Sequence, residues 1–411
     1  MKKYNVKFNN KTNDELIRLL IKTDNDKFQI LNNTNNIYNS NDISCHILNN
    51  KLVTLEYITN SEDETINLFY NDEKFNLYIN YCEDYETGEY INSYKYTFKN
   101  PGIHKINIDF KQNLTSLDRL FYNCSNLYSI PENLFKNCKN VTTFKGIFYN
   151  CTNIVEIPEG LFDNNTLATN FYCAFMSCSK IANIPQNLFK NCPNVTTFGS
   201  IFCNCTNIVE IPEGLFDNNT LVEDFSYTFY GCSKINKLPE GLFNKCTKAW
   251  NFNGTLKHCS MQTLDLSSWD TKNIKDISWF LHENLNLESV NVSNWDSKNM
   301  TNLRRAFGTC IKLKTLDLSS WEIPNATNID YFLTGCKSLT NLDISKFNIP
   351  ENIVKDAMFN NCISLMDVKC NRTTYEWIKE NKTTLKCPAI MINDCRYEIV
   401  DEPDTVVIGL L

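Results

Sequence analysis

Nineteen cysteines are the residues of this 411-residue chain with the widest range of chemistry. A thiolate can attack an electrophile, bind zinc or pair as a disulfide, so the placement of the cysteines decides among these roles. Nine of them recur at a period of 27 residues up to Cys259 and of 26 residues from Cys310 on, and Asn284 stands in the cysteine's place between the two series. An apolar residue lies three positions before each one. This cysteine column consists of Cys124, Cys151, Cys178, Cys205, Cys232, Cys259, Cys310, Cys336 and Cys362.

The regular spacing of the column argues against disulfides. Neighbouring coils of a stacked repeat lie about 4.8 Å apart, and bridging along the column would need a different side-chain geometry at every coil. The total number of cysteines is odd. A free cysteine packs as a small buried hydrophobe, so we predict a column of reduced thiols in the core that marks the register of the coils. Cys370, Cys387 and Cys395 lie outside the column, and whether they form a disulfide stays open.

Metal binding and catalysis have weak support in the sequence. Cys203 and Cys205 are spaced closely enough to suggest zinc, but Cys205 belongs to the column and Cys203 replaces Tyr149 of an otherwise identical segment. The four histidines fit no Ser/His/Asp or Cys/His arrangement. We therefore predict no catalytic residue, no metal site, no cofactor and no enzymatic activity. His258, beside a column cysteine, is expected to face solvent.

A second column is acidic and consists of Asp265, Asn291, Asp317 and Asp343, also at a period of 26 residues. Stacked carboxylates about 4.8 Å apart repel one another. They either point into water and accept local backbone N–H bonds, or contribute to a surface that binds a cation or another ligand. These four residues are the candidate ligand-binding residues. The aromatic column that follows them, Trp269, Trp295 and Trp321, is expected to pack in the core.

Self-similarity at a period of 25–27 residues over ten copies is typical of a solenoid, in which each repeat is one coil stacked on the last. In the first half each coil contains Ile-Pro or Leu-Pro, and in the second half the equivalent segment reads as a strand, such as Leu264-Asp265-Leu266. Proline cannot donate to a strand ladder, so the second half should form the better sheet. Residues 148–166 recur almost unchanged 54 residues later, which indicates duplication of a two-coil unit.

Three regions follow from this pattern. We predict a β-rich docking or capping domain over residues 1–102, a solenoid of about ten coils with short parallel strands over 103–368, and a cap over 369–411, because a terminal coil would expose unpaired backbone. Local patterns add strands at Ile66–Tyr70, Phe75–Ile79 and Tyr397–Val400, a turn at Pro101-Gly102, and helical turns at Asp14–Ile21 and Tyr375–Lys379.

The composition excludes some classes of partner. The net charge is −7 and no basic stretch suggests nucleic acid. The sequence contains no run of 18 apolar residues, so we predict no membrane insertion. The first residues are followed by Asn, Lys and Asp instead of an apolar stretch, so we expect no signal peptide. Together with the thiols, this favours a virion component or a surface protein placed by a non-classical route, in either case folded in a reducing cytoplasm.

The residues from Leu264 to Ile274, with the later Leu281, closely resemble the BspA-like leucine-rich repeat, a bacterial surface protein repeat of about 26 residues. Val290–Phe307 and Leu316–Cys336 are similar. The resemblance implies a leucine-rich-repeat solenoid with a non-enzymatic role in adhesion or recognition. Related repeats also occur in protists and in phage-encoded proteins.

We therefore predict a recognition or adhesion protein that binds a protein or a glycan on a cell surface through its solenoid, also as a phage virion component. The alternative is a purely structural component, held by neighbouring subunits of a larger assembly or acting as a cytoplasmic scaffold. Both readings place the function on the outward residues of the coils and not in a pocket.

Overall fold

The computed structural model describes residues 52–385 and six short strands on either side of them. These strands are β1 (Lys3–Val6), β2 (Ile17–Leu20), β3 (Ile30–Leu31), β4 (Ile37–Tyr38), β16 (Arg396–Val400) and β17 (Ile408–Gly409). The helical turns predicted at Asp14–Ile21 are wrong, because β2 pairs with β1 in an antiparallel ladder there. The strand predicted at Tyr397–Val400 is confirmed by β16. Cys387 and Cys395 lie outside the described residues.

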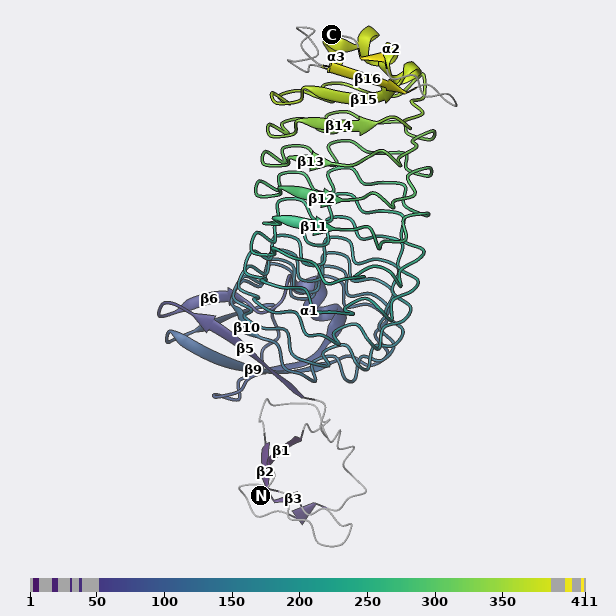
Figure 1. The fold of residues 1–411 in the computed structure, drawn as a ribbon. Coiled ribbons are helices and arrows are strands. Elements are labelled where there is room, and N and C mark those ends of the chain that lie inside the picture. Colours follow the sequence, from purple (N-terminus) through teal and green to yellow (C-terminus); the bar gives the residue numbers. More distant parts are fainter. Residues whose placement is uncertain are drawn as a thin grey trace.

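The chain stacks coil upon coil from an N-terminal sheet to a helical cap, so the predicted repeat solenoid is confirmed (Figure 1). In the second half one short strand per coil lies above the last: β11 (Thr263–Asp265), β12 (Ser289–Asn291), β13 (Thr315–Leu316), β14 (Asn341–Ile344) and β15 (Asp367–Asn371). The register follows the sequence period, since Leu264, Val290 and Leu316 are successive partners in the parallel ladder. We call the surface of β11–β15 the strand face.

The first half builds no such sheet, whereas the prolines predict only a poorer sheet than in the second half. The coils between β10 (Leu127–Ser129) and β11, all described, contain no strand, and their Ile-Pro segments make few bonds to the next coil. Adjacent coils of the first half are therefore held together at another part of the coil.

The backbone bonds between coils run along a segment that is not a strand. The N–H groups of Phe198, Ser200, Phe202 and Asn204 each donate to a carbonyl of the next coil at 2.6–3.0 Å. N–H groups between them close turns within their own coil, as Ile201 N does onto the Phe198 carbonyl at 3.1 Å and Cys203 N onto the Ser200 carbonyl at 3.2 Å. This alternation recurs in nine successive coils from residue 117 to residue 335. We call the surface of these segments the turn face. Its ten segments start at Ser116, Thr143, Asn170, Thr197, Asp224, Asn251, Asp276, Asn302, Asn328 and Val354.

The cysteine column lies just behind the turn face, and its thiols are hydrogen-bond donors. Cys205 donates to the carbonyl of Phe175, the apolar residue at the same corner of the preceding coil, at 3.1 Å. That carbonyl already accepts the backbone N–H of Cys178, so the thiol uses its second lone pair. Eight column thiols make this bond at 3.0–3.4 Å, namely Cys151, Cys178, Cys205, Cys232, Cys259, Cys310, Cys336 and Cys362.

Asn284, which interrupts the cysteines in the sequence, does not interrupt the bonding. Its Nδ2 donates to the Leu256 carbonyl at 2.8 Å, which is the carbonyl that a cysteine at this position would reach. It also donates to the Leu281 carbonyl at 2.9 Å. The column therefore selects a small buried donor, and sulfur is one of two ways to supply it.

A second donor column alternates the same two residue types at another corner. It consists of Cys138, Asn165, Cys192, Asn219 and Cys246, all buried. Asn165 donates to the Cys138 carbonyl at 2.9 Å, and the Cys192 thiol lies 3.6 Å from the Asn165 carbonyl. The alternation explains the 54-residue period, because each duplicated unit carries one coil with an amide donor and one with a thiol donor.

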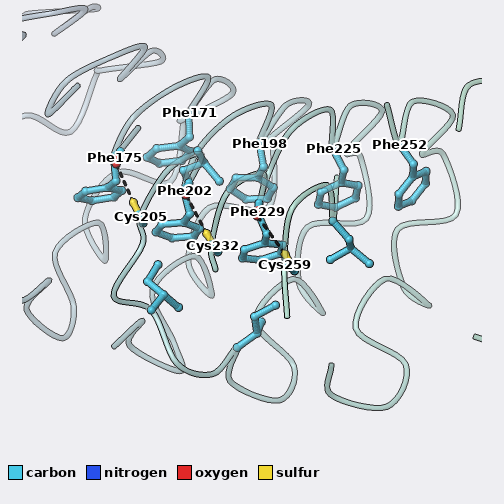
Figure 2. Packing of buried hydrophobic residues seen from close by; sticks show 14 of the residues in the cluster. Phe171, Phe175, Phe198, Phe202, Cys205, Phe225, Phe229, Cys232, Phe252 and Cys259 are labelled. Atoms are coloured by element: carbon cyan, nitrogen blue, oxygen red, sulfur yellow. Dashed lines mark hydrogen bonds between the residues drawn. The ribbon is translucent and has the colours of Figure 1, made fainter. Parts of the chain in front are cut away.

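Stacked aromatic rings lie beside the thiols of the cysteine column in the core (Figure 2). Phe175, Phe202 and Phe229 stack with centroids 5.8–5.9 Å apart, and Phe198 and Phe225 lie 6.1 Å apart in a parallel stack. A third stack begins with Phe135 and continues through Phe243 into the tryptophans. The predicted packing role of Trp269, Trp295 and Trp321 fits their burial and their spacing of 5.8 Å.

An antiparallel sheet covers the first coil. It has the order β10, β5 (Val53–Thr59), β9 (Gly102–Phe110) and β7 (Ile79–Asp84), and β10 itself comes from the first coil. β6 (Glu64–Asn67) and β8 (Lys95–Phe98) form a separate pair. The turn predicted at Pro101-Gly102 is confirmed between β8 and β9, although these two strands belong to different sheets.

Helix α1 (Asp72–Tyr78) corrects the strand predicted at Phe75–Ile79. The Asn71 side chain caps the helix by accepting the N–H of Lys74 at 2.9 Å, and Asp72 and Glu73 favour its positive end. Only Ile79 lies in a strand, as the first residue of β7. The neighbouring prediction at Ile66–Tyr70 holds as far as Asn67, where β6 ends.

The C-terminal cap continues the ladder and then closes it. β16 adds to β15 in parallel, and α2 (Arg372–Glu380) covers the end of the stack, which confirms the predicted helix at Tyr375–Lys379. Helix α3 (Lys382–Leu385) receives the last bond of the turn face, from Ala357 N to the Thr384 carbonyl at 2.7 Å.

We predict that Asn284→Cys raises the stability of the chain and that Asn284→Ala lowers it. The cysteine keeps a donor for the Leu256 carbonyl and removes Asn284 Oδ1, which is buried without a partner, a defect worth roughly 1–3 kcal/mol. Alanine removes the donor as well. Urea midpoints of the three chains measure the order. A midpoint of Asn284→Cys at or below that of Asn284→Ala would contradict the donor role.

We also predict that the buried thiols are free and make the fold sensitive to alkali. No disulfide joins cysteines within the described residues, and burial raises the pKa of Cys310 from 9.0 to about 12. A raised folded-state pKa leaves stability intact below pH 9 and costs about 1.4 kcal/mol per thiol and pH unit as the pH rises from 9 towards 12. Urea midpoints should therefore fall steeply above pH 9. In the absence of reductant, an alkylating reagent should label the column cysteines only after the chain is denatured. Column cysteines that stay unlabelled in urea would indicate disulfides.

Candidate functional site

Metal and membrane sites receive no support from the part of the chain that the structure describes. Residues 52–385 contain no group of three or more His, Cys, Asp or Glu side chains placed to hold a metal ion. No helix among the described residues is long and apolar enough to cross a bilayer. The candidate sites are therefore the two extended surfaces of the solenoid, the strand face and the turn face.

The acidic column lies on the strand face and is engaged in local hydrogen bonds. Asp265 Oδ1 accepts the N–H of Ser267 at 3.0 Å and its hydroxyl at 2.7 Å. The Ser267 hydroxyl bond is the main reason why the pKa of the Asp265 carboxyl is lowered. Asn291 bonds Ser293 in the same way. Asp317 and Asp343 each accept the backbone N–H of the serine two residues on, at 2.9 and 3.0 Å. These side chains form the turn that ends each strand.

The strand face is hollowed, but the hollow is open and its charges are partly matched. The larger depression, of about 560 Å³, is lined by β13–β15 and includes Asp317, Asp343, Asp367 and Lys369. Lys369 Nζ lies 3.7 Å from Asp343 Oδ2. The predicted ligand-binding residues thus lie along one face of the solenoid. Their hydrogen bonds to the serine two residues on already explain why Asp or Asn recurs at this position in each coil.

The tryptophan column lies behind this surface and not on it. Trp295 Nε1 donates to the Leu266 carbonyl at 2.8 Å, and Trp321 Nε1 donates to the Val292 carbonyl at 3.2 Å. Each indole thus ties two coils together and is unavailable to a partner.

The turn face carries residues that the sequence analysis missed. The position five residues before each column residue lies between constant apolar positions that are buried, and its bulky side chains are half-buried or exposed. Its occupants vary widely: Arg119, Gly146, Cys173, Ser200, Tyr227, Gly254, Trp279, Arg305, Tyr331 and Ala357. We call it the display position. A variable position inside a constant repeat was the signal that could have found it.

All ten display positions have a left-handed backbone, although their side chains differ. The φ angles of Arg119, Tyr227, Trp279, Arg305 and Tyr331 are 53–60°. Glycine adopts such angles freely, as Gly146 and Gly254 do at φ 60° and 59°, whereas a bulky side chain there costs roughly 1–2 kcal/mol. The fold requires the backbone conformation but not the bulky side chains.

The large side chains of the turn face lie flat across neighbouring coils. The Tyr227 ring occupies the space above Gly254, where an added Cβ would meet ring carbons at 2.5–2.6 Å. Trp279 has the ammonium of Lys257 4.5 Å from its ring centroid, from the preceding coil, and the guanidinium of Arg305 4.7 Å away, from the following coil. Arg305 also lies 4.3 Å from the Tyr331 centroid. Its guanidinium therefore packs against two aromatic rings.

Two histidines border this cluster and differ in environment. His258 is exposed, as predicted. His282 is 2% exposed, and its ring lies edge-on to Trp279 with centroids 4.7 Å apart. Burial lowers the pKa of His282 to about 4; Glu283 opposes this shift, and Lys257 and Arg305 add to it. His282 is therefore neutral at neutral pH.

Solved structures with similar folds are leucine-rich repeat proteins, including bacterial surface proteins. One from Bacteroides ovatus is 16% identical over 67% of this chain and 88% of that one, with a TM-score of 0.19. A leucine-rich cell surface protein from Faecalibacterium prausnitzii is 17% identical over 66% and 84%, with a TM-score of 0.26. The functional domain of InlJ from Listeria monocytogenes, described as including a cysteine ladder, is 17% identical over 76% and 58%, with a TM-score of 0.27. At these TM-scores the likeness carries no inference about what this chain binds.

No curated protein matches the sequence. One protein-family model matches the repeats themselves, over residues 115–241 and 250–371, which together exceed half of the chain. The chain therefore belongs to the family described as Mycoplasma protein of unknown function, DUF285.

Proposed function

We propose that this chain is a non-enzymatic recognition protein that binds a partner through its turn face. The observation that carries the proposal is the backbone strain at the display position. Five bulky side chains occupy left-handed conformations that glycine would adopt without cost, and strained residues of this kind cluster at functional sites.

The strain has no compensation in the core. The five bulky display side chains are half-buried or exposed, and the coils at Gly146 and Gly254 stack with the same bonds between coils as the others. Gly146 N, for example, donates to the Tyr172 carbonyl at 2.8 Å, as Arg119 N donates to the Lys145 carbonyl at 2.9 Å. A function outside the fold explains why Arg119, Tyr227 and Trp279 are present.

The residue types at these positions are those that dominate binding energy at protein interfaces. Tyrosine, tryptophan and arginine supply large contact areas and are enriched among interface residues whose truncation costs the most. The continuous backbone ladder beneath them fixes their spacing, which lowers the entropy lost on binding. A partner of sufficient length would contact several coils at once.

The setting of this recognition is a second part of the proposal. The resemblance to BspA-like repeats implies adhesion to a protein or glycan on a cell surface. The cysteines of the donor columns donate only as free thiols, which favours folding in a reducing compartment and supports a role in an assembly formed there, such as a phage virion. Mass spectrometry of purified particles from the source decides this setting, since absence of the chain would exclude it.

Replacing the five bulky display residues by glycine should abolish binding and leave the fold intact. The variant carries Arg119→Gly, Tyr227→Gly, Trp279→Gly, Arg305→Gly and Tyr331→Gly in the full chain. Relief of about 1 kcal/mol per residue offsets lost cation–π contacts of about 0.5–1 kcal/mol each, so the urea midpoint should stay near that of the natural chain. Binding is measured on glycan arrays and intact bacterial cells, where we expect a loss of roughly tenfold or more.

The matched control replaces exposed apolar residues outside the turn face. Leu167→Ser and Val209→Ser change side chains that are 48% and 49% exposed, and this variant should bind as the natural chain does. Unchanged binding by the five-glycine variant would contradict the proposal, as would a failure of the natural chain to bind any glycan or cell. A large loss of stability in the five-glycine variant would assign the display residues to the fold.

A further inference from the structure

Positive charge gathers at one place on the turn face. Lys257, Arg304 and Arg305 all lie within 6 Å of the centre of the Trp279 ring, at 4.5, 5.9 and 4.7 Å. We call Lys257, Trp279, Arg304, Arg305 and Tyr331 the cationic patch. It concentrates charge of one sign on a chain whose net charge is −7.

The two arginines of the patch have no carboxylate partner within the described residues. The carboxylate of Glu283 lies 3.6 Å from Lys257 Nζ, 3.7 Å from His258 Nδ1 and 3.5 Å from His282 Nε2. Asp356 Oδ2 accepts the Tyr331 hydroxyl at 3.0 Å. Glu283 thus pairs with the lysine of the patch and not with its arginines.

The floor of the patch holds polar atoms without partners. His282 Nδ1, Arg304 Nε and Arg305 Nε are buried and make no hydrogen bond. Gly308 leaves room for the imidazole, since a Cβ there would lie 2.8 Å from His282 Nδ1. Buried polar atoms without partners are uncommon in folded proteins, and three of the nine among the described residues belong to side chains around this one indole.

The geometry suits a carboxylate. Arg305 is held between the rings of Trp279 and Tyr331, which fixes the plane of its guanidinium before any partner arrives. A guanidinium binds a carboxylate through two parallel N–H bonds, and a fixed plane lowers the entropy cost of forming them. Arg304 and Lys257 supply further charge to a second carboxylate of the same segment.

The same geometry favours a protein over a glycan. Sugar rings bind proteins by stacking on exposed aromatic faces, but Trp279 lies between cations from the preceding and the following coil. Tyr331 carries Arg305 against its ring. The patch therefore offers charge and directed N–H groups in place of open ring faces.

We propose that the cationic patch docks an acidic segment of a partner protein, whose Asp or Glu carboxylates bind Arg305 and its neighbours Arg304 and Lys257. This inference rests on the proposed function and names the chemistry of one contact within it. It adds that the partner carries clustered carboxylates at the place where it meets the coils from residue 254 to residue 334.

A labelled hexaglutamate peptide tests the proposal by fluorescence anisotropy with the full chain at low ionic strength. The natural chain should bind, and added salt should weaken binding because the contact is ionic. Arg304→Ala combined with Arg305→Ala should weaken it by roughly tenfold or more, and Arg305→Lys should weaken it less, because the charge remains and the planar fork is lost.

Lys272→Ala combined with Lys298→Ala is the matched control, since it removes two cations outside the turn face whose side chains are 58% and 59% exposed. It should leave peptide binding unchanged. Equal losses in this control and in the arginine double variant, or no binding by the natural chain, would overturn the proposal. Tighter binding of a heparin-derived hexasaccharide with the same dependence on Arg305 would overturn it in favour of a sulfated glycan. The five-glycine variant distinguishes the proposed function from this inference. If that variant no longer binds cells or glycans, and the peptide does not bind even the natural chain, the proposed function stands and this inference fails.

Discussion

The structure depends on supplying a second hydrogen bond to one buried carbonyl in each coil. The apolar residue three positions before the column residue turns its carbonyl inward, away from water and away from the ladder between coils. Its own turn provides one N–H, and the side chain one coil later provides the other donor, a thiol or an amide. A buried carbonyl without a good partner destabilises a fold, so this position tolerates only small buried donors. Coil number can then vary, because each new coil brings the donor that its predecessor needs.

This arrangement explains how a surface without strands can be rigid. Alternate N–H groups of the turn face bond the next coil, and the others close turns within the coil. This bonding pattern requires a left-handed backbone at the display position. Glycine fits such a backbone, yet five display positions carry bulky residues, namely Arg119, Tyr227, Trp279, Arg305 and Tyr331. The strand face is built differently: its Asp and Asn side chains bond the next serine and end the strands. The two faces therefore differ in role: the strand face carries side chains that form local turns, and the turn face carries partly exposed aromatic and cationic side chains.

Much of the fold follows from the sequence, because a period of 26–27 residues leaves little choice but stacked coils. The weak sheet of the first half could be foreseen from Pro131 to Pro239, since proline lacks the N–H that a ladder needs. The α1 helix was mistaken for a strand because Phe75, Leu77 and Ile79 alternate, although Asn71 followed by Asp72 and Glu73 was a capping signal. In the sequence Asn284 interrupts the cysteine column, because asparagine and cysteine are different residue types. Their shared property, a small side chain that donates a hydrogen bond, is visible only in the structure. The turn face escaped notice because its residues vary, and a search for repeated chemistry passes over variable positions.

The central claim is that the turn face is a continuous, rigid backbone ladder that carries the binding residues. Amide hydrogen exchange of the full chain tests it most directly, because protected amides mark bonds that persist in the native state. The account predicts that the amides of Phe198, Ser200, Phe202 and Asn204 exchange as slowly as those of strand β12, and that the Ile-Pro segments of the same coils exchange quickly. Exchange of these four amides at the rate of an open loop would contradict it.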